Sequence, residues 1–589
     1  MLPSKPKKKP YPACDSCKAK RVLCYSTPDG PCPRCVEKGI LCKTTYIQRG
    51  RPKKNGSPPA NALQTTPLPG PSTPVDPLLS LTPELTKHLF KCFNDLPHKQ
   101  HPILHRVQLD KLIASASWRI DLLPPQAAVL ATCICAVGAT VSWHPGILAP
   151  GPGPRSPESL TDTTVIHPGA DLRVYGERRA AACRVLQERT ISMACAARVM
   201  LEPSEMNAAS CMLLETLEED LENSSRPWAS AYLSHLRAIS PRWPDREPGP
   251  AFWAGYLMAE ALRAAINRKP VLVTLADQLF FTGNTPPPLQ SYLDAMKQQP
   301  REGPWKTTVA PTTRIRAVFD CVVPFLFHMV CSAREFYEQI AGDFARRNPP
   351  SEPEIVKLLN TLSTTQNLIS HYFSGIDFPE TAALNASSLS PAELRSRPET
   401  YPEFRSCAYI MTVVFTGLAL SLYRELEHRA ASDATILAQQ PAAPQTAKWA
   451  QTRIAVIREQ AHELVLSALP DVHRLTLLQT FPLCAISVAW SNVAAWGDFL
   501  AEEADAVGGL LDGHVAVAER IMNTLKGAGY SQISVRFDAT IARLDAHLTA
   551  YKLGKALPAV EALMGAPDTA MSDMSFFLDG PWMVTSTGV

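Results

Sequence analysis

The sequence lacks the short motifs that mark common enzyme active sites. After residue 80 it contains no H-E-x-x-H, G-x-S-x-G, G-x-x-x-x-G-K-[ST] or G-x-G-x-x-G pattern. Alternation of apolar and polar residues, the pattern of half-buried β-strands, is scarce in the same region. We therefore expect a protein that is not an enzyme and that contains little β-sheet.

Membrane-directing segments are also absent or weak. The first residues, Met1 to Lys5, contain no apolar stretch of the kind found in secretory signals. Two uncharged segments of 17 residues, Ala127–Trp143 and Cys407–Tyr423, are at the short limit for crossing a bilayer and are rich in small residues. We therefore expect no membrane insertion, and a reducing compartment in which cysteines remain thiols.

What the chain has instead is a group of six cysteines near its N-terminus, spaced C-x2-C-x6-C-x7-C-x2-C-x6-C. Thiolates suit zinc, and a C-x2-C pair can hold one ion from a single tight turn. Two independent tetrahedral sites need about eight sulfurs, so six sulfurs close two sites only if two thiolates are shared. The spacing predicts a binuclear cluster with two Zn²⁺ per chain; the alternative, a disulfide framework, needs an oxidising compartment. The predicted ligands are Cys14, Cys17, Cys24, Cys32, Cys35 and Cys42.

The cysteine cluster is an internal repeat of C-x2-C-x6-C, at residues 14–24 and 32–42. Each copy ends its six-residue insert in an apolar pair, Val22-Leu23 or Ile40-Leu41, and we expect these pairs to pack the two copies together. The inserts differ in charge: the second pairs one Glu with one Lys, whereas the first carries Lys18, Lys20 and Arg21.

Cations at a helix start can donate to guanine O6 and N7 in the major groove and to the phosphates beside it. The first copy is therefore predicted to contact DNA; the alternative is a solvated charged turn on a purely structural zinc site. Residues 1–54 hold fourteen Lys or Arg against three acidic residues, a net charge of +11, while residues 55–589 carry −8. Six thiolates and two Zn²⁺ add about −2 to the first segment, which still leaves the electrostatic footprint of a nucleic-acid-binding head.

The segment from Ala13 to Cys42 closely resembles the fungal binuclear zinc-cluster transcription factors, including the basic run after Cys17 and the loop proline Pro31. The resemblance implies that Cys14 and Cys32 bridge the two ions, that Cys17 and Cys24 complete one site, and that Cys35 and Cys42 complete the other. It also implies that Arg21 occupies the family's base-reading position and that CGG half-sites are read. Leu23 stands where the family usually has Lys or Arg, so one phosphate contact is expected to be lost.

Two basic segments flank the cluster. Upstream, a lysine run is interpreted as a nuclear-import signal, a phosphate-contacting arm, or both; it consists of Lys5, Lys7, Lys8 and Lys9. Downstream, residues 49–54 resemble an AT-hook, in which Arg49 and Arg51 would enter a narrow minor groove. The alternative for this second segment is an ordinary basic tail.

The remaining chain is divided into a linker, a large body and a tail. We expect a basic N-terminal arm (1–12), the zinc-cluster DNA-binding domain (13–43), a basic and then proline-rich linker (44–80), an all-α body (81–555) and a C-terminal tail (556–589). The linker shows no heptad pattern, so a homodimer, if it forms, is not expected to use a coiled coil there. The tail interleaves Asp with Phe, Met and Trp between Asp568 and Met583; this segment either activates transcription or packs back onto the body.

Helical periodicity dominates the body. Helices are predicted around 127–141, buried on all sides, and around 208–222, 454–468 and 537–548; loops are predicted at 146–160, 283–312, 374–404 and 431–447. Acidic residues at 215–222 are expected to form a solvated helix face, and the group His98, His101 and His105 is expected to lie at turns and helix starts rather than on a metal. The body weakly resembles the helical regulatory domain of the same fungal family, through His101–His105, Leu123–Pro125, Gly138-Ala139, Phe252-Trp253 and Arg268–Val271.

The leading hypothesis is a sequence-specific DNA-binding regulator of RNA polymerase II transcription in a fungal nucleus. Its expected partners are double-stranded DNA and the transcription machinery or its coactivators. The alternative is a zinc-stabilised corepressor or interaction subunit whose basic head binds nucleic acid without sequence choice.

Overall fold

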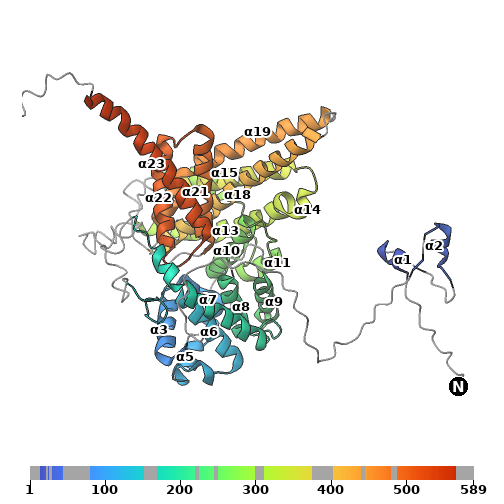
Figure 1. Cartoon of the computed structure of the whole chain (residues 1–589), viewed down its shortest axis with the longest axis vertical. Helices are drawn as coiled ribbons and strands as arrows, with labels where there is room; N and C mark the ends of the chain where they lie inside the picture. Colours follow the sequence, from blue (N-terminus) through green and yellow to red (C-terminus); the bar gives the residue numbers. More distant parts are fainter. Residues whose placement is uncertain are drawn as a thin grey trace, which may run out of the picture. The chain divides into compact units, whose positions relative to one another are not determined.

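A computed structural model describes residues 14–20, 24, 30–40, 42–43, 80–151, 169–218, 225–243, 250–298, 311–373, 402–439, 445–478 and 487–564. The described residues are mostly helical and contain no β-strand, as the sequence predicts (Figure 1). The chain divides into two compact units, Met1–Pro74 and Val75–Val589. The first contains the cysteine cluster and the second contains the body.

The first unit has two short helices, α1 (Asp15–Ala19) and α2 (Pro33–Glu37). The helices of the second unit are α3 (Pro83–Asn94), α4 (Pro102–Arg106), α5 (Leu109–Ser115), α6 (Pro125–Ala139), α7 (Arg173–Ala196), α8 (Glu205–Leu217), α9 (Pro227–Ile239), α10 (Pro250–Ile266), α11 (Leu275–Thr282), α12 (Leu289–Gln298), α13 (Pro311–Glu335), α14 (Asp343–Arg346), α15 (Glu352–Phe373), α18 (Pro402–Gln439), α19 (Gln445–Ser467), α20 (Leu469–Leu478), α21 (Ser487–Val507), α22 (Asp512–Ala528) and α23 (Val535–Met564). Short 3₁₀ turns are η1 (Pro97–Gln100), η2 (Ile120–Leu122) and η4 (Ser240–Arg242), and η5 (Phe336–Ala341) is a π-helical turn.

Helix α6 is the centre of the N-terminal half of the body. It is buried from Ala127 to Ala139 and packs against α3, α7 and α8, which confirms the prediction of a helix that is apolar on all sides. Gly138 allows α3 to approach closely, because a Cβ atom there would lie 2.3 Å from the carbonyl oxygen of Leu89.

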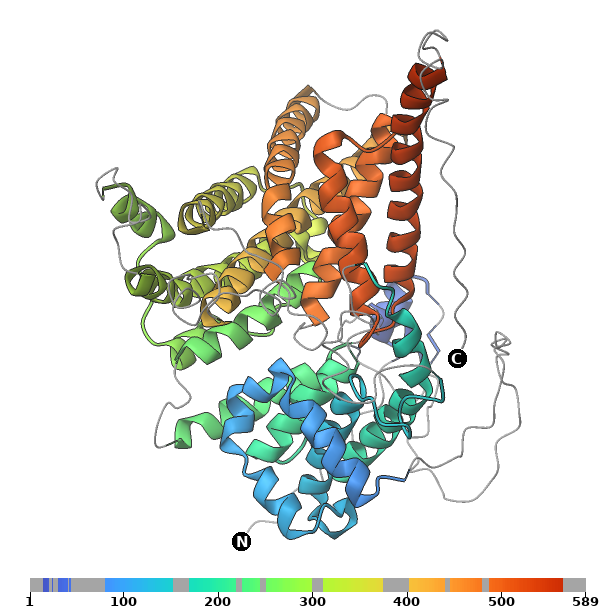
Figure 2. The ribbon, with the colours of Figure 1, turned by 90° about the vertical axis from the view of Figure 1, so that its left-hand side faces the viewer.

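Helix α18 has the same central role in the C-terminal half, where it contacts α10, α13, α15, α19, α20 and α21 (Figures 1 and 2). Among the described residues, the stretch Phe404–Ser432 of α18 is long and apolar enough to cross a membrane. However, 78% of its most apolar window is buried inside the protein. The apolar surface of this helix is therefore already covered by neighbouring helices.

Helices α21, α22 and α23 pack against one another, and α23 continues to Met564 (Figure 2). The expected boundary between body and tail, at residue 555, thus lies inside a helix. The possible activation segment from Asp568 to Met583 lies outside the described residues.

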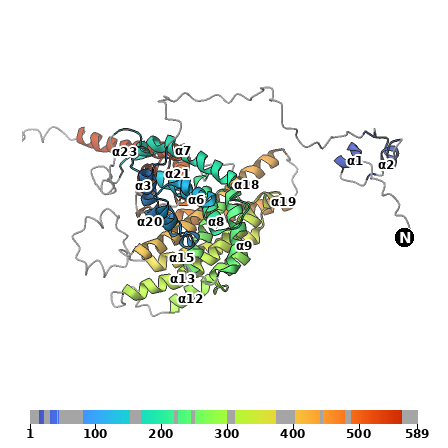
Figure 3. The same cartoon turned by 90° about the horizontal axis from the view of Figure 1, so that it is seen from below.

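Two stretches predicted as loops contain helix. α12 lies within 283–312, and α18 occupies the first part of 431–447. Prolines at 286–288 suggested a loop, but they immediately precede α12, where a missing backbone donor costs little. Leu289 and Leu293 of α12 are buried, and α12 lies beside α13 and α15 (Figure 3).

The prediction of a solvated acidic face at 215–222 is wrong for Glu215. Its side chain is only 13% exposed, and it accepts hydrogen bonds from Arg226 Nε at 2.8 Å and from the Ala229 backbone N–H at 3.2 Å. Arg226 also donates to the buried Glu260 at 3.0 Å. The partners of Glu215 lie at the start of α9 and on α10, where Arg263 Nη1 is 3.7 Å from Glu215 Oε1. Helical periodicity within α8 alone cannot reveal these ion pairs.

Candidate metal centre and nucleic-acid interface

The two copies of the cysteine repeat have the same local backbone. Each begins with a cysteine as helix N-cap, Cys14 before α1 (φ −64°, ψ 156°) and Cys32 before α2 (φ −65°, ψ 147°). The second cysteine of each copy, Cys17 or Cys35, follows three residues later in the helix, so both sulfurs lie on the same side of the turn. The C-terminal end of the second copy is joined to the first, because the Asp15 N–H donates to the Lys43 carbonyl at 2.9 Å.

The sulfur atoms are spaced as they would be around metal ions. Cys14 Sγ lies 3.7 Å from Cys35 Sγ and 3.9 Å from both Cys32 Sγ and Cys24 Sγ, and Cys17 Sγ lies 3.8 Å from Cys32 Sγ. Sulfurs at the corners of a tetrahedron around Zn²⁺, with bonds of about 2.3 Å, lie about 3.8 Å apart. A disulfide would instead bring two sulfurs to about 2.05 Å. The six thiols can therefore hold metal, and no two of them are bonded to each other.

The thiols form two sets of four that share two members. One set is Cys14, Cys17, Cys24 and Cys32, and the other is Cys14, Cys32, Cys35 and Cys42; within each, the sulfurs lie within 4.8 Å of one another. The shared pair, Cys14 and Cys32, is the pair that the family resemblance implies as bridging.

The two shared thiols also differ electrostatically from the others. The backbone N–H of Cys17, in the first turn of α1, lowers the pKa of Cys14 to about 6. The Cys35 N–H in α2 lowers the pKa of Cys32 in the same way. By contrast, burial is the main cause that raises the pKa of Cys17, to about 12. Helix starts favour thiolates, so the two shared positions are the ones at which the fold best supports negative charge.

Among the described residues of the first unit, the buried apolar cluster is made of cysteines. It consists of Cys14, Cys17, Cys32 and Cys35, with Cys24 and Cys42 packed beside them. Ile40 is 37% exposed and is not part of this buried cluster; the other residues expected to pack the two copies together, Val22, Leu23 and Leu41, lie outside the described residues. A unit held together in this way depends on what its sulfurs bind.

Two of the predicted DNA-contacting residues are described. Lys18, in the last turn of α1, and Lys20, its C-cap, are both exposed. They lie at the end of this helix and not, as expected from the sequence, at a helix start, because α1 is only five residues long and begins at Asp15. The other predicted contact residues lie outside the described residues; they are Arg21, Arg49, Arg51, Lys5, Lys7, Lys8 and Lys9. Sequence reasoning gave no role to Arg34, which is an exposed cation on α2. Its position between the two cysteines of the second C-x2-C pair could have marked it as a cation close to the cysteine cluster.

The histidine group in the body has a structural role. His101 is the N-cap of α4: its Nδ1 accepts the Ile103 N–H at 3.2 Å, and its Nε2 lies 3.4 Å from the Tyr232 hydroxyl. Its ring packs edge-on against Tyr256, with centroids 4.4 Å apart. Burial lowers the pKa of His101 to about 3 and that of His98 to about 4. Among the described residues, only the cysteine sets have metal-ligand geometry.

Comparisons of the chain with models of known families, with curated proteins and with solved structures give no match.

Proposed function

We propose that this protein is a sequence-specific DNA-binding regulator of RNA polymerase II transcription that acts in a fungal nucleus. Its head would be a binuclear zinc cluster with two Zn²⁺ per chain, which presents the first cysteine repeat to the major groove at CGG-type half-sites. The helical body would have a regulatory rather than a catalytic role, and the transcription machinery or its coactivators would be its protein partners.

The observation that carries this proposal is the shared pair of thiols beside an exposed cationic helix. Six sulfurs in two overlapping sets of four fit two ions with Cys14 and Cys32 as bridges. Zinc would act structurally here, fixing α1 and α2 in place of an apolar core. Fixing α1 also fixes the exposed Lys18 and Lys20 that it carries.

Charge supports nucleic acid as the partner of this head. The segment 1–54 has a net charge of +11 in an otherwise acidic chain, so its attraction to phosphate is strong and salt-dependent. Phosphate attraction alone gives no sequence choice. In the proposal, sequence choice comes from Lys18 and Lys20 at the end of α1 and from Arg21, the next residue in the sequence, because such side chains can donate to base edges.

Selection of bound DNA from a random pool by the full-length protein tests the sequence choice. Enrichment of a CGG-containing core supports the proposal. Salt-sensitive binding without a consensus would instead support the zinc-stabilised interaction subunit and contradict sequence-specific regulation.

Zinc content tests the shared-ligand geometry separately. Elemental analysis should give about two zinc ions per chain, and chelation should unfold the head. Cys24 belongs to one set of four sulfurs and Cys14 to both. We therefore expect Cys24→Ser to keep about one tightly held ion, and Cys14→Ser to weaken both. One zinc in the unmodified protein, or equal losses in the two variants, would contradict bridging by Cys14.

A further inference from the structure

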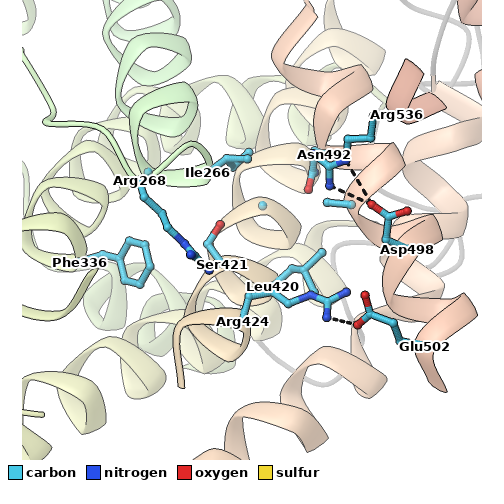
Figure 4. Close-up of a pocket in the computed structure, with 13 residues that line it drawn as sticks. Ile266, Arg268, Phe336, Leu420, Ser421, Arg424, Asn492, Asp498, Glu502 and Arg536 are labelled. Atoms are coloured by element: carbon cyan, nitrogen blue, oxygen red, sulfur yellow. Dashed lines mark hydrogen bonds and ion pairs between the residues drawn. The ribbon is translucent and has the colours of Figure 1, made fainter. Parts of the chain in front are cut away.

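A cavity of about 270 Å³ that is partly open to solvent lies in the body between α10, η5, α18, α21 and α23 (Figure 4). Each of these elements contributes lining residues, so the cavity exists only in the folded body. Its volume is just below the range of roughly 300–1,000 Å³ that is usual for drug-sized ligands, which suits a smaller molecule.

The polar lining of the cavity has more arginine than carboxylate. Arg424 pairs with Glu502, and Arg536 pairs with Asp498 at 3.1 Å. Figure 4 shows these two pairs on the side of α21, whereas Arg268 reaches into the cavity from the opposite side, toward Ser421. The third arginine is thus the one whose charge the lining carboxylates do not balance.

The nearest carboxylate to Arg268 is already committed to other arginines. Glu425 Oε2 lies 3.8 Å from Arg268 Nε, beyond hydrogen-bonding distance. Glu425 accepts from Arg346 Nε at 2.9 Å and from Arg429 Nε at 3.1 Å. Three guanidinium groups therefore lie near one buried carboxylate. Arg268, whose side chain is 40% exposed, makes no hydrogen bond to it, so its donors remain available to an anion in the cavity.

The backbone at Arg268 is that of a position where glycine is usual. The Lys269 N–H donates to the Ala264 carbonyl at 2.8 Å and the Arg268 N–H to the Ala265 carbonyl at 3.1 Å, which is the Schellman pattern that ends α10. Arg268 occupies its left-handed position, with φ 53°. Glycine adopts this conformation without a steric cost, whereas a residue with a Cβ atom does not. Arginine at this position is therefore less favourable for the backbone than glycine would be.

The other walls are apolar, with two neutral polar groups. The apolar wall is formed by Ala265, Ile266, Phe336, Leu420 and Ala495. Phe336 begins the π-helical turn η5, a geometry that often occurs at functional sites. The Ser421 hydroxyl and the Asn492 amide also line the cavity, next to the arginines.

We propose that this cavity binds a small organic carboxylate with a short apolar tail. The guanidinium fork of Arg268 would hold the carboxylate, because its planar donors match two oxygens at once, and the tail would lie against Phe336 and Leu420. The inference goes beyond the proposed DNA-binding function and does not depend on it, since every lining residue belongs to the body.

The test titrates the full-length protein by calorimetry, at constant pH and ionic strength, with acetate, butanoate, hexanoate and inorganic phosphate. We expect one site per chain for hexanoate, and affinity that rises about fourfold for each added methylene group as the tail is buried. Arg268→Gln should weaken hexanoate binding by roughly 10- to 100-fold, as expected for loss of a charge-assisted hydrogen bond. Arg268→Gly should give the same loss, and because glycine suits the left-handed position, it also controls for misfolding.

Arg543→Gln is the matched control. Arg543 is on α23 like Arg536 and pairs with Asp505 at 2.9 Å, but it does not line the cavity, so hexanoate binding should be unchanged. Three results would overturn the proposal: no heat of binding for hexanoate, affinity for phosphate or acetate equal to that for hexanoate, or unchanged binding in folded Arg268→Gln.

Discussion

Replacing Glu425 by glutamine should destabilise the body by about 3–5 kcal/mol, the usual cost of removing one partner from a buried ion pair. Glu425 is fully buried on α18 and contacts Arg346 and Arg429, and the Arg429 side chain is only 7% exposed. Glutamine keeps the size of the side chain and one acceptor oxygen, but it removes the negative charge. Arg429 would then remain buried with only neutral acceptors such as the Asn348 carbonyl, at 3.2 Å.

Urea unfolding followed by far-UV circular dichroism measures this effect. With a slope of about 3 kcal/mol per molar urea, the expected loss lowers the midpoint by about 1–1.7 M. Glu335→Gln is the control: Glu335 pairs with Lys357 at 2.9 Å, but its side chain is 45% exposed, so the loss should be about 0–1 kcal/mol. Equal midpoints for the two variants would refute the idea that the buried carboxylate holds the arginine cluster together.

Three further predictions concern the head, the histidines and the end of α10. Arg21→Ala should weaken the binding free energy for cognate DNA by roughly 1–3 kcal/mol and relax base choice, whereas Lys7→Ala should weaken binding to cognate and random DNA alike. Quantitative DNA-binding measurements distinguish the two effects. An equal loss on cognate and random DNA in Arg21→Ala would contradict base reading by Arg21. Burial lowers the pKa of His101 to about 3, so between about pH 6.5 and pH 3 the unfolded chain binds more protons than the folded one. The stability that the neutral His101 contributes is therefore complete above about pH 6.5 and falls by up to about 1.4 kcal/mol per pH unit toward pH 3. Unfolding midpoints at several pH values should show a shallower decline in His101→Gln, and an unchanged decline would reject the assignment. Arg268→Val should be about 1–2 kcal/mol less stable than Arg268→Gly by urea unfolding, because a β-branched residue fits the left-handed backbone poorly; equal stabilities would argue against strain there.

The metal-site geometry could be predicted from sequence because it is encoded locally. Each C-x2-C pair is held by one short helix and its N-cap, so the spacing of Cys14 and Cys17 almost fixes where their sulfurs lie. Because there are six sulfurs, two sets of four can form only if the sets have two sulfurs in common. What the spacing alone did not identify was which two are shared; that depends on how the two copies meet, through contacts such as Asp15 N–H to the Lys43 carbonyl.

The body was predictable only at the level of its helices. Burial of α6 followed from its composition. The partners Arg226 of Glu215 and Arg346 of Glu425 lie outside the helices that carry these carboxylates, so the periodicity of those helices does not reveal them. The same limit applies to the cavity. Arg268, Ser421, Asp498 and Arg536 come from four separate parts of the chain, and none of them breaks the local pattern enough to mark a site.

The helices α1 and α2 have matching backbones, but the two halves of the head differ in what their surfaces can bind. Both copies are needed to complete the sulfur sets, but only the first carries a cluster of cations after its second cysteine. The exposed side of α2, where Val36 is 62% exposed, carries none of the sulfurs and can therefore be changed without removing a metal ligand. A second cationic surface could be engineered there: Val36→Lys would add a cation on the exposed side of α2 near Lys38. Gly39 should be kept, because its φ of 60° suits glycine and any other residue would strain the turn after α2.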